Sequence, residues 1–127
     1  MGHYQLSAET SFSAAHTLPG VDLCERFHGH NWNVRLTVRV DEPGLDKTGM
    51  GIDFRVIEQT VRDAVEDWDH RYLNDVEPFR DIAPTAENIA RVLCDRAAES
   101  LAGNGNVSVA EVEVWETPKY RVIYRPG

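Results

Sequence analysis

Residues 33–40 read NVRLTVRV, and their side chains alternate between apolar and polar types without exception. Valine or leucine occupies every even-numbered position from Val34 to Val40, and asparagine, arginine or threonine occupies every odd-numbered one. Because successive side chains of a β-strand point to opposite faces, the pattern predicts a half-buried antiparallel strand. The run Asp41-Glu42-Pro43-Gly44 is typical of the turn that ends such a strand.

The segments on either side of this strand carry their own periodicity. Apolar residues recur at helical spacing after two expected N-cap residues, Asp53 and Thr85. Alternation predicts three more strands, at residues 4–12, 107–116 and 119–125. The order strand-strand-helix-helix-strand-strand predicts one α+β domain over residues 1–127, an antiparallel sheet with both helices on one face.

The bulk composition narrows the class of protein. The 127 residues carry a net charge of −8 and contain no basic run, which argues against a nucleic-acid partner. No apolar stretch is long enough for a membrane span, and residues 1–6 lack the pattern of a signal peptide, so we expect a cytoplasmic protein. A domain of this size buries only a modest core, which favours assembly with further copies of the chain.

The segment His28-Gly29-His30 leads directly into the decisive strand. Two histidines at i and i+2 share one face of a strand, and here that face continues through Trp32 to Val34. A third histidine, His16, follows the first predicted strand. Three neutral imidazoles leave one open position on a tetrahedral zinc ion, as in catalytic sites. The alternative is a pair of hydrogen-bonded structural histidines.

Three further places in the sequence carry reactive side chains, each with an ordinary explanation beside the functional one. A nearby dication would lower the pKa of the Cys24 thiol, so that the thiolate could act as a base. The alternative is that Cys24 is a small buried apolar residue, as we expect for Cys94. Asp69-His70 provides a proton-transfer pair, or a helix end in water.

Glu116 is the third of these places. Strict alternation in the strand at 107–116 places Val112, Val114 and Glu116 on one face and Val109 on the other. The Glu116 carboxylate therefore ends an apolar face, where it can accept two N–H bonds from an amidine-like ligand edge, unless the strand has ended and the side chain is in water.

Together these segments resemble the family of pyruvoyl- and carboxy-tetrahydropterin synthases, over nearly the whole chain. Each motif alone is weak evidence for the resemblance, but five motifs in the family's order are specific evidence. The matching segments are Phe12-Ser13-Ala14-Ala15-His16, Cys24-Glu25-Arg26-Phe27-His28-Gly29-His30, Trp68-Asp69-His70 with Leu73-Asn74, Pro84-Thr85-Ala86-Glu87-Asn88, and Glu113-Val114-Trp115-Glu116-Thr117.

The resemblance implies a fold, a cofactor and an assembly. The fold is the tunnelling fold, in which several copies join their sheets into a barrel, typically as a homohexamer of two stacked trimers with active sites between subunits. Zn²⁺ on His16, His28 and His30 is implied to lower the pKa of the side-chain hydroxyls of a dihydroneopterin substrate.

The resemblance also implies roles for single residues. Cys24 is the base at the side-chain carbon, with Asp69 and His70 exchanging its proton. Glu116 anchors the 2-amino and N3 edge of the pterin, and Thr85 helps to line that pocket.

The cysteine pattern favours one reaction within that family. Members with this pattern that come from bacteria usually make 6-carboxytetrahydropterin from 7,8-dihydroneopterin triphosphate, with loss of acetaldehyde and triphosphate, for 7-deazapurine and queuosine synthesis. Animal-type members make 6-pyruvoyltetrahydropterin. A folate-pathway branch has glutamate where Glu25 stands and makes 6-hydroxymethyldihydropterin. Outside the family, an unrelated zinc hydrolase and a non-catalytic pterin binder remain as alternatives.

Overall fold

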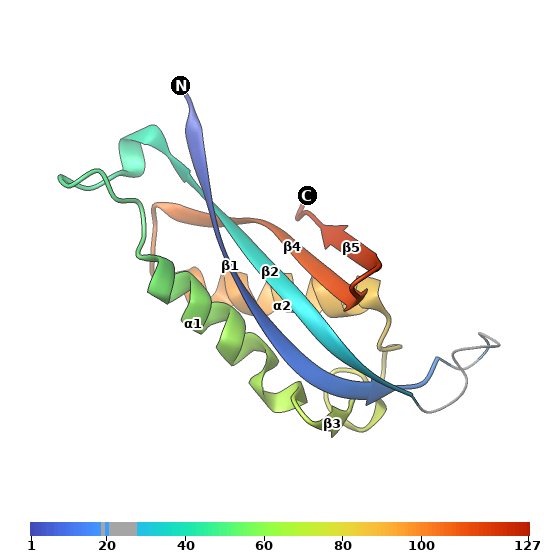
Figure 1. Cartoon of the computed structure of the whole chain (residues 1–127). Helices are drawn as coiled ribbons and strands as arrows, with labels where there is room; N and C mark the ends of the chain where they lie inside the picture. Colours follow the sequence, from blue (N-terminus) through green and yellow to red (C-terminus); the bar gives the residue numbers. More distant parts are fainter. Residues whose placement is uncertain (19, 21–27) are drawn as a thin grey trace.

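The computed structural model describes residues 1–18, 20 and 28–127, with the backbone alone at His28. Figure 1 shows a curved sheet with both helices against one of its faces, the α+β arrangement that the sequence predicts. The elements follow in the order β1 (His3–His16), β2 (His28–Asp41), η2 (Glu42–Gly44), α1 (Phe54–Val65), η3 (Glu66–Trp68), β3 (Arg71–Tyr72), η4 (Leu73–Asp75), α2 (Ala86–Leu101), β4 (Val107–Thr117) and β5 (Tyr120–Tyr124).

The sheet has the strand order β3-β1-β2-β4-β5. Strands β1, β2, β4 and β5 pair antiparallel, as predicted, and the β1–β2 ladder runs from His3 opposite Asp41 to His16 opposite His28. The added strand β3 pairs parallel with β1 at Ala14 and Ala15, so the sheet is not wholly antiparallel. Two residues have no periodicity, and for that reason alternation does not predict β3.

The apolar face of β2 forms the centre of the core. Its side chains Val34, Leu36, Val38 and Val40 are fully or almost fully buried. Val34, Leu36 and Val38 pack in one cluster with apolar residues of both helices, which on α1 are Ile57, Val61, Ala64 and Val65 and on α2 are Ile89, Ala90, Val92, Leu93, Cys94, Ala97 and Leu101. Burial of apolar surface between the sheet and this helix layer stabilises the arrangement that positions the functional residues.

One expected side-chain direction in β4 is wrong. The β2–β4 register shifts between Thr37, opposite Glu111, and Val38, opposite Val109. Ala110 is the extra residue of this β-bulge, which changes the alternation that the sequence pattern assumes. Val109 therefore lies opposite the core residue Val38 and packs against the core, instead of facing outward.

Both helices begin at the predicted N-cap residues. The Asp53 side chain accepts a hydrogen bond from the Arg55 N–H, and Thr85 accepts one from the Asn88 N–H. On α2, burial raises the pKa of the Cys94 thiol, with a smaller contribution from Asp95, which fits the inert role expected of it. Within the described ranges, no helix combines the length and apolar character needed to cross a membrane.

Candidate functional site

His16 and His30 lie on neighbouring strands at the end of the β1–β2 ladder, on its core-facing side. His16 is fully buried and the side chain of His30 is 19% exposed. Their ring centroids are 5.3 Å apart. The buried indole of Trp32 contacts both rings edge-on, and its Nε1 donates to the carbonyl of Ala14, which fixes the floor beneath them. Strand parity therefore brings together two of the three predicted zinc ligands.

A backbone carbonyl sets the tautomer of His16. The Nδ1 atom of His16 lies 2.8 Å from the carbonyl oxygen of Pro84, in the loop before α2. Because a carbonyl oxygen only accepts hydrogen bonds, Nδ1 carries a proton, and in the neutral ring the free lone pair is on Nε2. This is the usual arrangement of a metal-binding histidine, in which the other ring nitrogen is held by a hydrogen-bond acceptor.

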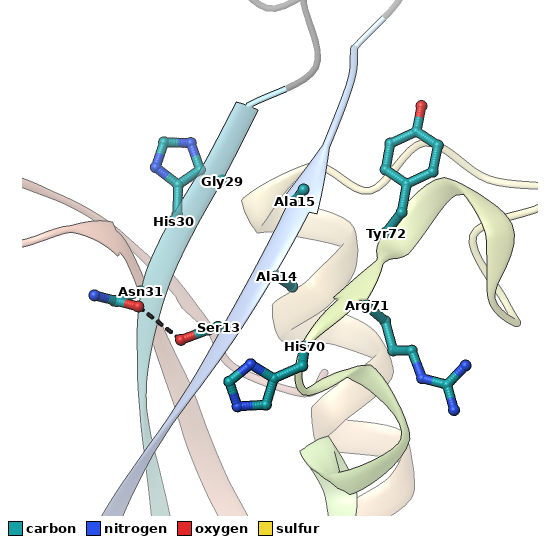
Figure 2. A pocket seen from close by; sticks show the side chains of 9 residues that line it. All are labelled: Ser13, Ala14, Ala15, Gly29, His30, Asn31, His70, Arg71 and Tyr72. Carbon is teal, nitrogen blue, oxygen red and sulfur yellow. Dashed lines mark hydrogen bonds between the residues drawn. The ribbon is translucent and has the colours of Figure 1, made fainter.

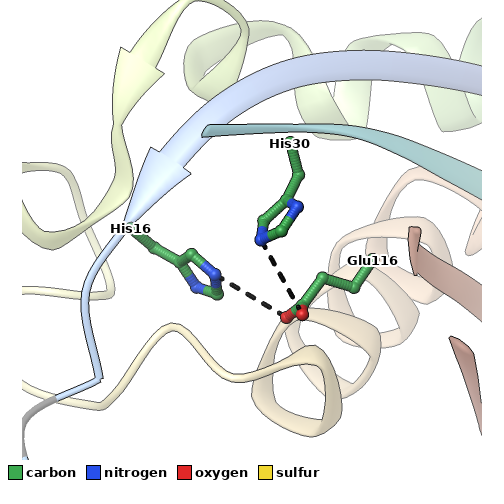
Figure 3. Close-up of side chains that lie close together, drawn as sticks. All are labelled: His16, His30 and Glu116. Atoms are coloured by element: carbon green, nitrogen blue, oxygen red, sulfur yellow. Dashed lines mark ion pairs between the residues drawn. The ribbon is translucent and has the colours of Figure 1, made fainter. Parts of the chain in front are cut away.

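Glu116 completes this group from β4. The β4–β5 register shifts between Trp115 and Thr117, so Glu116 stands at a β-bulge, a feature that redirects side chains. Its carboxylate oxygens lie 3.6 Å from Nε2 of His16 and 3.7 Å from Nε2 of His30 (Figure 3). The side chain is 26% exposed, so one of the two alternatives for Glu116, a carboxylate surrounded by water, does not apply.

The spacing of these three side chains fits a metal ion. Donor atoms of His16, His30 and Glu116 all lie within 4.8 Å of one another. Two ligands of a tetrahedral zinc ion, each about 2.0–2.1 Å from the metal, are roughly 3.3–3.4 Å apart, close to the two measured histidine–carboxylate distances. His28 lies opposite His16 in the backbone register. The donor chemistry and the spacing are therefore compatible with a metal site.

His70 lines a pocket of about 450 Å³ to which His30 also contributes. Figure 2 shows His30 on the β2 side of β1 and His70 on the β3 side. The His70 side chain is 82% exposed, and its Nε2 lies 3.6 Å from Oδ2 of Asp69. The other oxygen of Asp69 accepts the backbone N–H of Ser13 at 2.9 Å, so this carboxylate connects β1 to His70. An exposed imidazole with a carboxylate partner can exchange protons with a ligand in the pocket.

The backbone of His70 is in the left-handed region, with φ of 59°. Few residues other than glycine adopt this conformation, which stores strain and is concentrated at functional sites. The N–H of His70 donates to the carbonyl of Ser13 at 2.6 Å, and this bond holds the strained residue in place.

The side chain of Thr85, expected to line the pterin pocket, makes a helix-capping hydrogen bond. Its hydroxyl oxygen accepts the N–H of Asn88 at 3.1 Å and thereby caps α2, directly after the Pro84 carbonyl that holds His16. Cys24 and Glu25 lie outside the described residues. The sequence patterns missed the Pro84 carbonyl and the pocket residues Arg71 and Tyr72, because a backbone acceptor has no residue signature and β3 has no periodicity.

Comparisons with known proteins point to one family. The family model described as 6-pyruvoyl tetrahydropterin synthase matches residues 5–127. A 6-carboxy-5,6,7,8-tetrahydropterin synthase of Bacillus subtilis is 35% identical over 97% of this chain and 86% of its own length. A dihydroneopterin monophosphate aldolase of Pyrococcus furiosus is 31% identical over 88% of this chain and 89% of its own length.

The fold is also shared with solved structures. The 6-pyruvoyl tetrahydropterin synthase of Caenorhabditis elegans superposes with a TM-score of 0.84 at 27% identity, over 100% of this chain and 98% of the other. Sequence and structure therefore identify the same group of proteins.

Proposed function

The chain belongs to the 6-pyruvoyl tetrahydropterin synthase family, and on this premise we propose that it is a 6-carboxy-5,6,7,8-tetrahydropterin synthase. Its reaction converts 7,8-dihydroneopterin triphosphate to 6-carboxytetrahydropterin, with loss of acetaldehyde and triphosphate. The observation that carries this proposal is the group of His16, His30 and Glu116, whose donor atoms converge at the end of the β1–β2 ladder. A likeness of 35% to a relative of that name supports the choice of product.

Zinc is the proposed cofactor, held by His16, His28 and His30. When bound, it supplies Lewis-acid polarisation of the side-chain hydroxyls of the substrate. The Pro84 carbonyl engages Nδ1 of His16, so Nε2 is the ring nitrogen proposed to bind the metal. The buried position of His16 and the packing of Trp32 limit movement of the two described rings, which keeps the donor atoms in place before the metal binds.

Proton movement is assigned to Cys24, Asp69 and His70. Cys24, as thiolate, takes a proton at the side-chain carbon of the substrate. Asp69 orients His70 through the contact between Oδ2 and Nε2, while its other oxygen stays on the Ser13 N–H. An imidazole is suited to this exchange because its ordinary pKa is near neutrality.

Glu116 is proposed to anchor the 2-amino and N3 edge of the pterin, with Thr85 lining the same pocket. Two parallel N–H bonds from that edge to one carboxylate would resemble an arginine–carboxylate pair. In this structure the same carboxylate lies against His16 and His30, so metal binding and ring binding compete for it. One variant distinguishes these two partners.

In Glu116→Gln we expect kcat/KM for the pterin substrate to fall by about 100-fold, because the amide puts a donor where the ring edge needs an acceptor, and a hydrogen bond to a charged group is worth about 1.5–3 kcal/mol. Zinc content, measured by metal analysis of the purified variant, should stay at one ion per chain. Loss of zinc from this variant would place Glu116 among the metal ligands and would contradict the anchoring role.

The assembly proposed for this chain is a homohexamer of two trimers, with active sites between subunits. The sheet supports edge-to-edge joining, because β5 forms one edge and the first part of β1 lies at the other, beyond the two-residue pairing with β3. Sedimentation of the purified protein measures this state directly. The cytoplasmic location stays a prediction.

The reaction itself is tested by incubating the zinc-loaded protein with 7,8-dihydroneopterin triphosphate and identifying the products by mass spectrometry. Carboxytetrahydropterin with acetaldehyde is the expected result. The likeness to a dihydroneopterin monophosphate aldolase supports a second candidate, formation of hydroxymethyldihydropterin. That product would reassign the activity to the branch that Glu25 suggests, and pyruvoyltetrahydropterin would reassign it to the animal-type reaction.

A further inference from the structure

Asn74 has no role in the chemistry described above, yet its side chain binds a single backbone residue twice. Its Oδ1 accepts the N–H of Thr17 at 2.9 Å, and its Nδ2 donates to the carbonyl of the same residue at 3.0 Å. Because both backbone groups of Thr17 are satisfied by one amide, Asn74 takes the place of a hydrogen-bonded residue on a neighbouring strand. Thr17 directly follows His16, the last residue of β1.

These two bonds extend a continuous attachment along the outer edge of β1. At Ser13, the backbone N–H and carbonyl bind the Asp69 carboxylate and the His70 N–H. Strand β3 then pairs with Ala14 and Ala15, and Asn74 binds Thr17. Residues 69–74 therefore hold the chain from Ser13 to Thr17, the stretch that contains His16.

The position of His16 depends on this attachment. Its ring is fully buried and is held on one side by the Pro84 carbonyl at 2.8 Å. Thr17 is held a second time through its hydroxyl, which lies 2.8 Å from the Tyr72 hydroxyl. If Asn74 releases Thr17, the end of β1 can move relative to Pro84, and Nε2 of His16 then moves relative to Nε2 of His30 and to Glu116.

We propose that Asn74 is a positioning residue that fixes the metal ligand His16 through the backbone of Thr17. This inference rests on the proposed function for the identity of the metal, but it concerns zinc affinity and not the reaction. Loss of groups that orient metal ligands from outside the coordination sphere typically weakens metal binding by about 10- to 100-fold.

Asn106 provides a matched control at the other end of the ladder. Its side-chain amide also makes two bonds to backbone, donating to the carbonyls of Gly44 at 3.0 Å and Gly51 at 2.7 Å. These glycines follow β2 beyond Asp41, whereas His16 lies opposite His28 at the first residue of that strand. Asn74→Ala and Asn106→Ala thus remove the same kind of interaction, near the site and far from it.

The experiment measures zinc affinity of the full-length chain by competition with a chelator, alongside the free energy of unfolding of each metal-free variant. We expect Asn74→Ala to bind zinc about 10-fold more weakly than the wild type. Asn106→Ala should remain within about twofold of the wild type, because distant sites act independently, even where both variants lose stability.

Equal zinc affinity of Asn74→Ala and wild type, or equal losses in the two asparagine variants, would overturn the proposal. If Asn74→Ala does not fold, Asn74→Asp replaces it: it keeps an acceptor for the Thr17 N–H and loses the donor to the Thr17 carbonyl, so its affinity should also fall. The proposed function fails separately, if zinc-loaded wild type makes no pterin product, and that result leaves the comparison of zinc affinities intact.

Discussion

The two ends of the β1–β2 ladder present the same sheet face to the same helix layer, yet they have different chemistry. At one end, Val40 is buried beneath Gly51, in the loop that leads to α1. At the other end, His16 is buried beneath Pro84, in the loop that leads to α2. Each covering loop ends in a helix N-cap, Asp53 at the first and Thr85 at the second.

The difference lies in what each loop offers to the strand beneath it. Gly51 offers a close approach without a side chain, so an apolar residue packs there. Pro84 offers a carbonyl oxygen, so a buried imidazole finds an acceptor for its proton. A buried polar group is stable only with such a partner, and the same sheet face therefore supports apolar packing at one end and a group of polar side chains at the other.

The largest expected effect comes from one substitution in each region: a change at the histidine end should reduce activity, and a change in the apolar core should reduce stability. His16→Ala should lose its zinc and reduce kcat/KM by about 1000-fold or more, because Lewis-acid stabilisation is worth several kcal/mol. Val38→Ala, on the same face in the apolar core, should lower the free energy of unfolding by about 2 kcal/mol and keep zinc and kcat. Metal analysis, kinetics and denaturant unfolding of both variants check this. A Val38→Ala protein without zinc would show that the two ends are not independent.

The apolar end is tested more directly by Gly51→Ala. An added Cβ would lie 2.8 Å from Cγ1 and 2.9 Å from Cγ2 of Val40, a β-branched residue that cannot easily turn away. Overpacking of this kind should cost about 2 kcal/mol of unfolding free energy while turnover stays normal. Urea unfolding gives the value. A variant as stable as wild type would mean that the loop moves freely over β2.

The left-handed backbone of His70 gives a smaller effect on stability, and its size depends on which residue replaces the histidine. His70→Ala and His70→Gly both remove the imidazole and should both lower turnover. Glycine adopts a φ of 59° without strain, so His70→Gly should be about 1 kcal/mol more stable than His70→Ala. Thermal unfolding of the pair measures the difference, and equal stabilities would show that residue 70 relaxes out of the left-handed conformation in the alanine variant.

The two helix caps give the smallest effect, through pH. A side-chain hydrogen bond from Arg55, then its N–H, lower the pKa of Asp53 to about 2. Since this pKa lies below the ordinary value of about 3.9, the ionised cap stabilises the fold above pH 4, and this contribution is lost as pH falls toward 2. Unfolding midpoints of wild type and Asp53→Asn should therefore differ near neutrality and converge in acid. Thr85→Ser is the control, because this cap is uncharged: any difference in unfolding midpoint between it and wild type should not change with pH. If the difference between Asp53→Asn and wild type is also constant with pH, the ionised carboxylate does not have the stabilising role assigned to it.

Much of the fold was predictable because it follows from local periodicity. The alternation in residues 33–40, the caps Asp53 and Thr85, and the order of the two long helices and four longer strands agree with the structure. Val109 was placed on the wrong face, because a bulge at Ala110 depends on how β4 pairs with β2 and not on the residues of β4 alone. Strand β3 escaped prediction because its two residues are ordered by their contact with β1.

The sequence by itself determined which chemical groups are available and which strand face they occupy. Parity placed His30 on the same side as Trp32 and Val34, and the motif order indicated the family. Only the tertiary structure decided that Glu116 meets His16 and His30, that Pro84 sets the tautomer of His16, and that Asn74 binds Thr17. These contacts join residues that are far apart in the chain, and they depend on sheet register, bulges and loop paths, which no local pattern encodes.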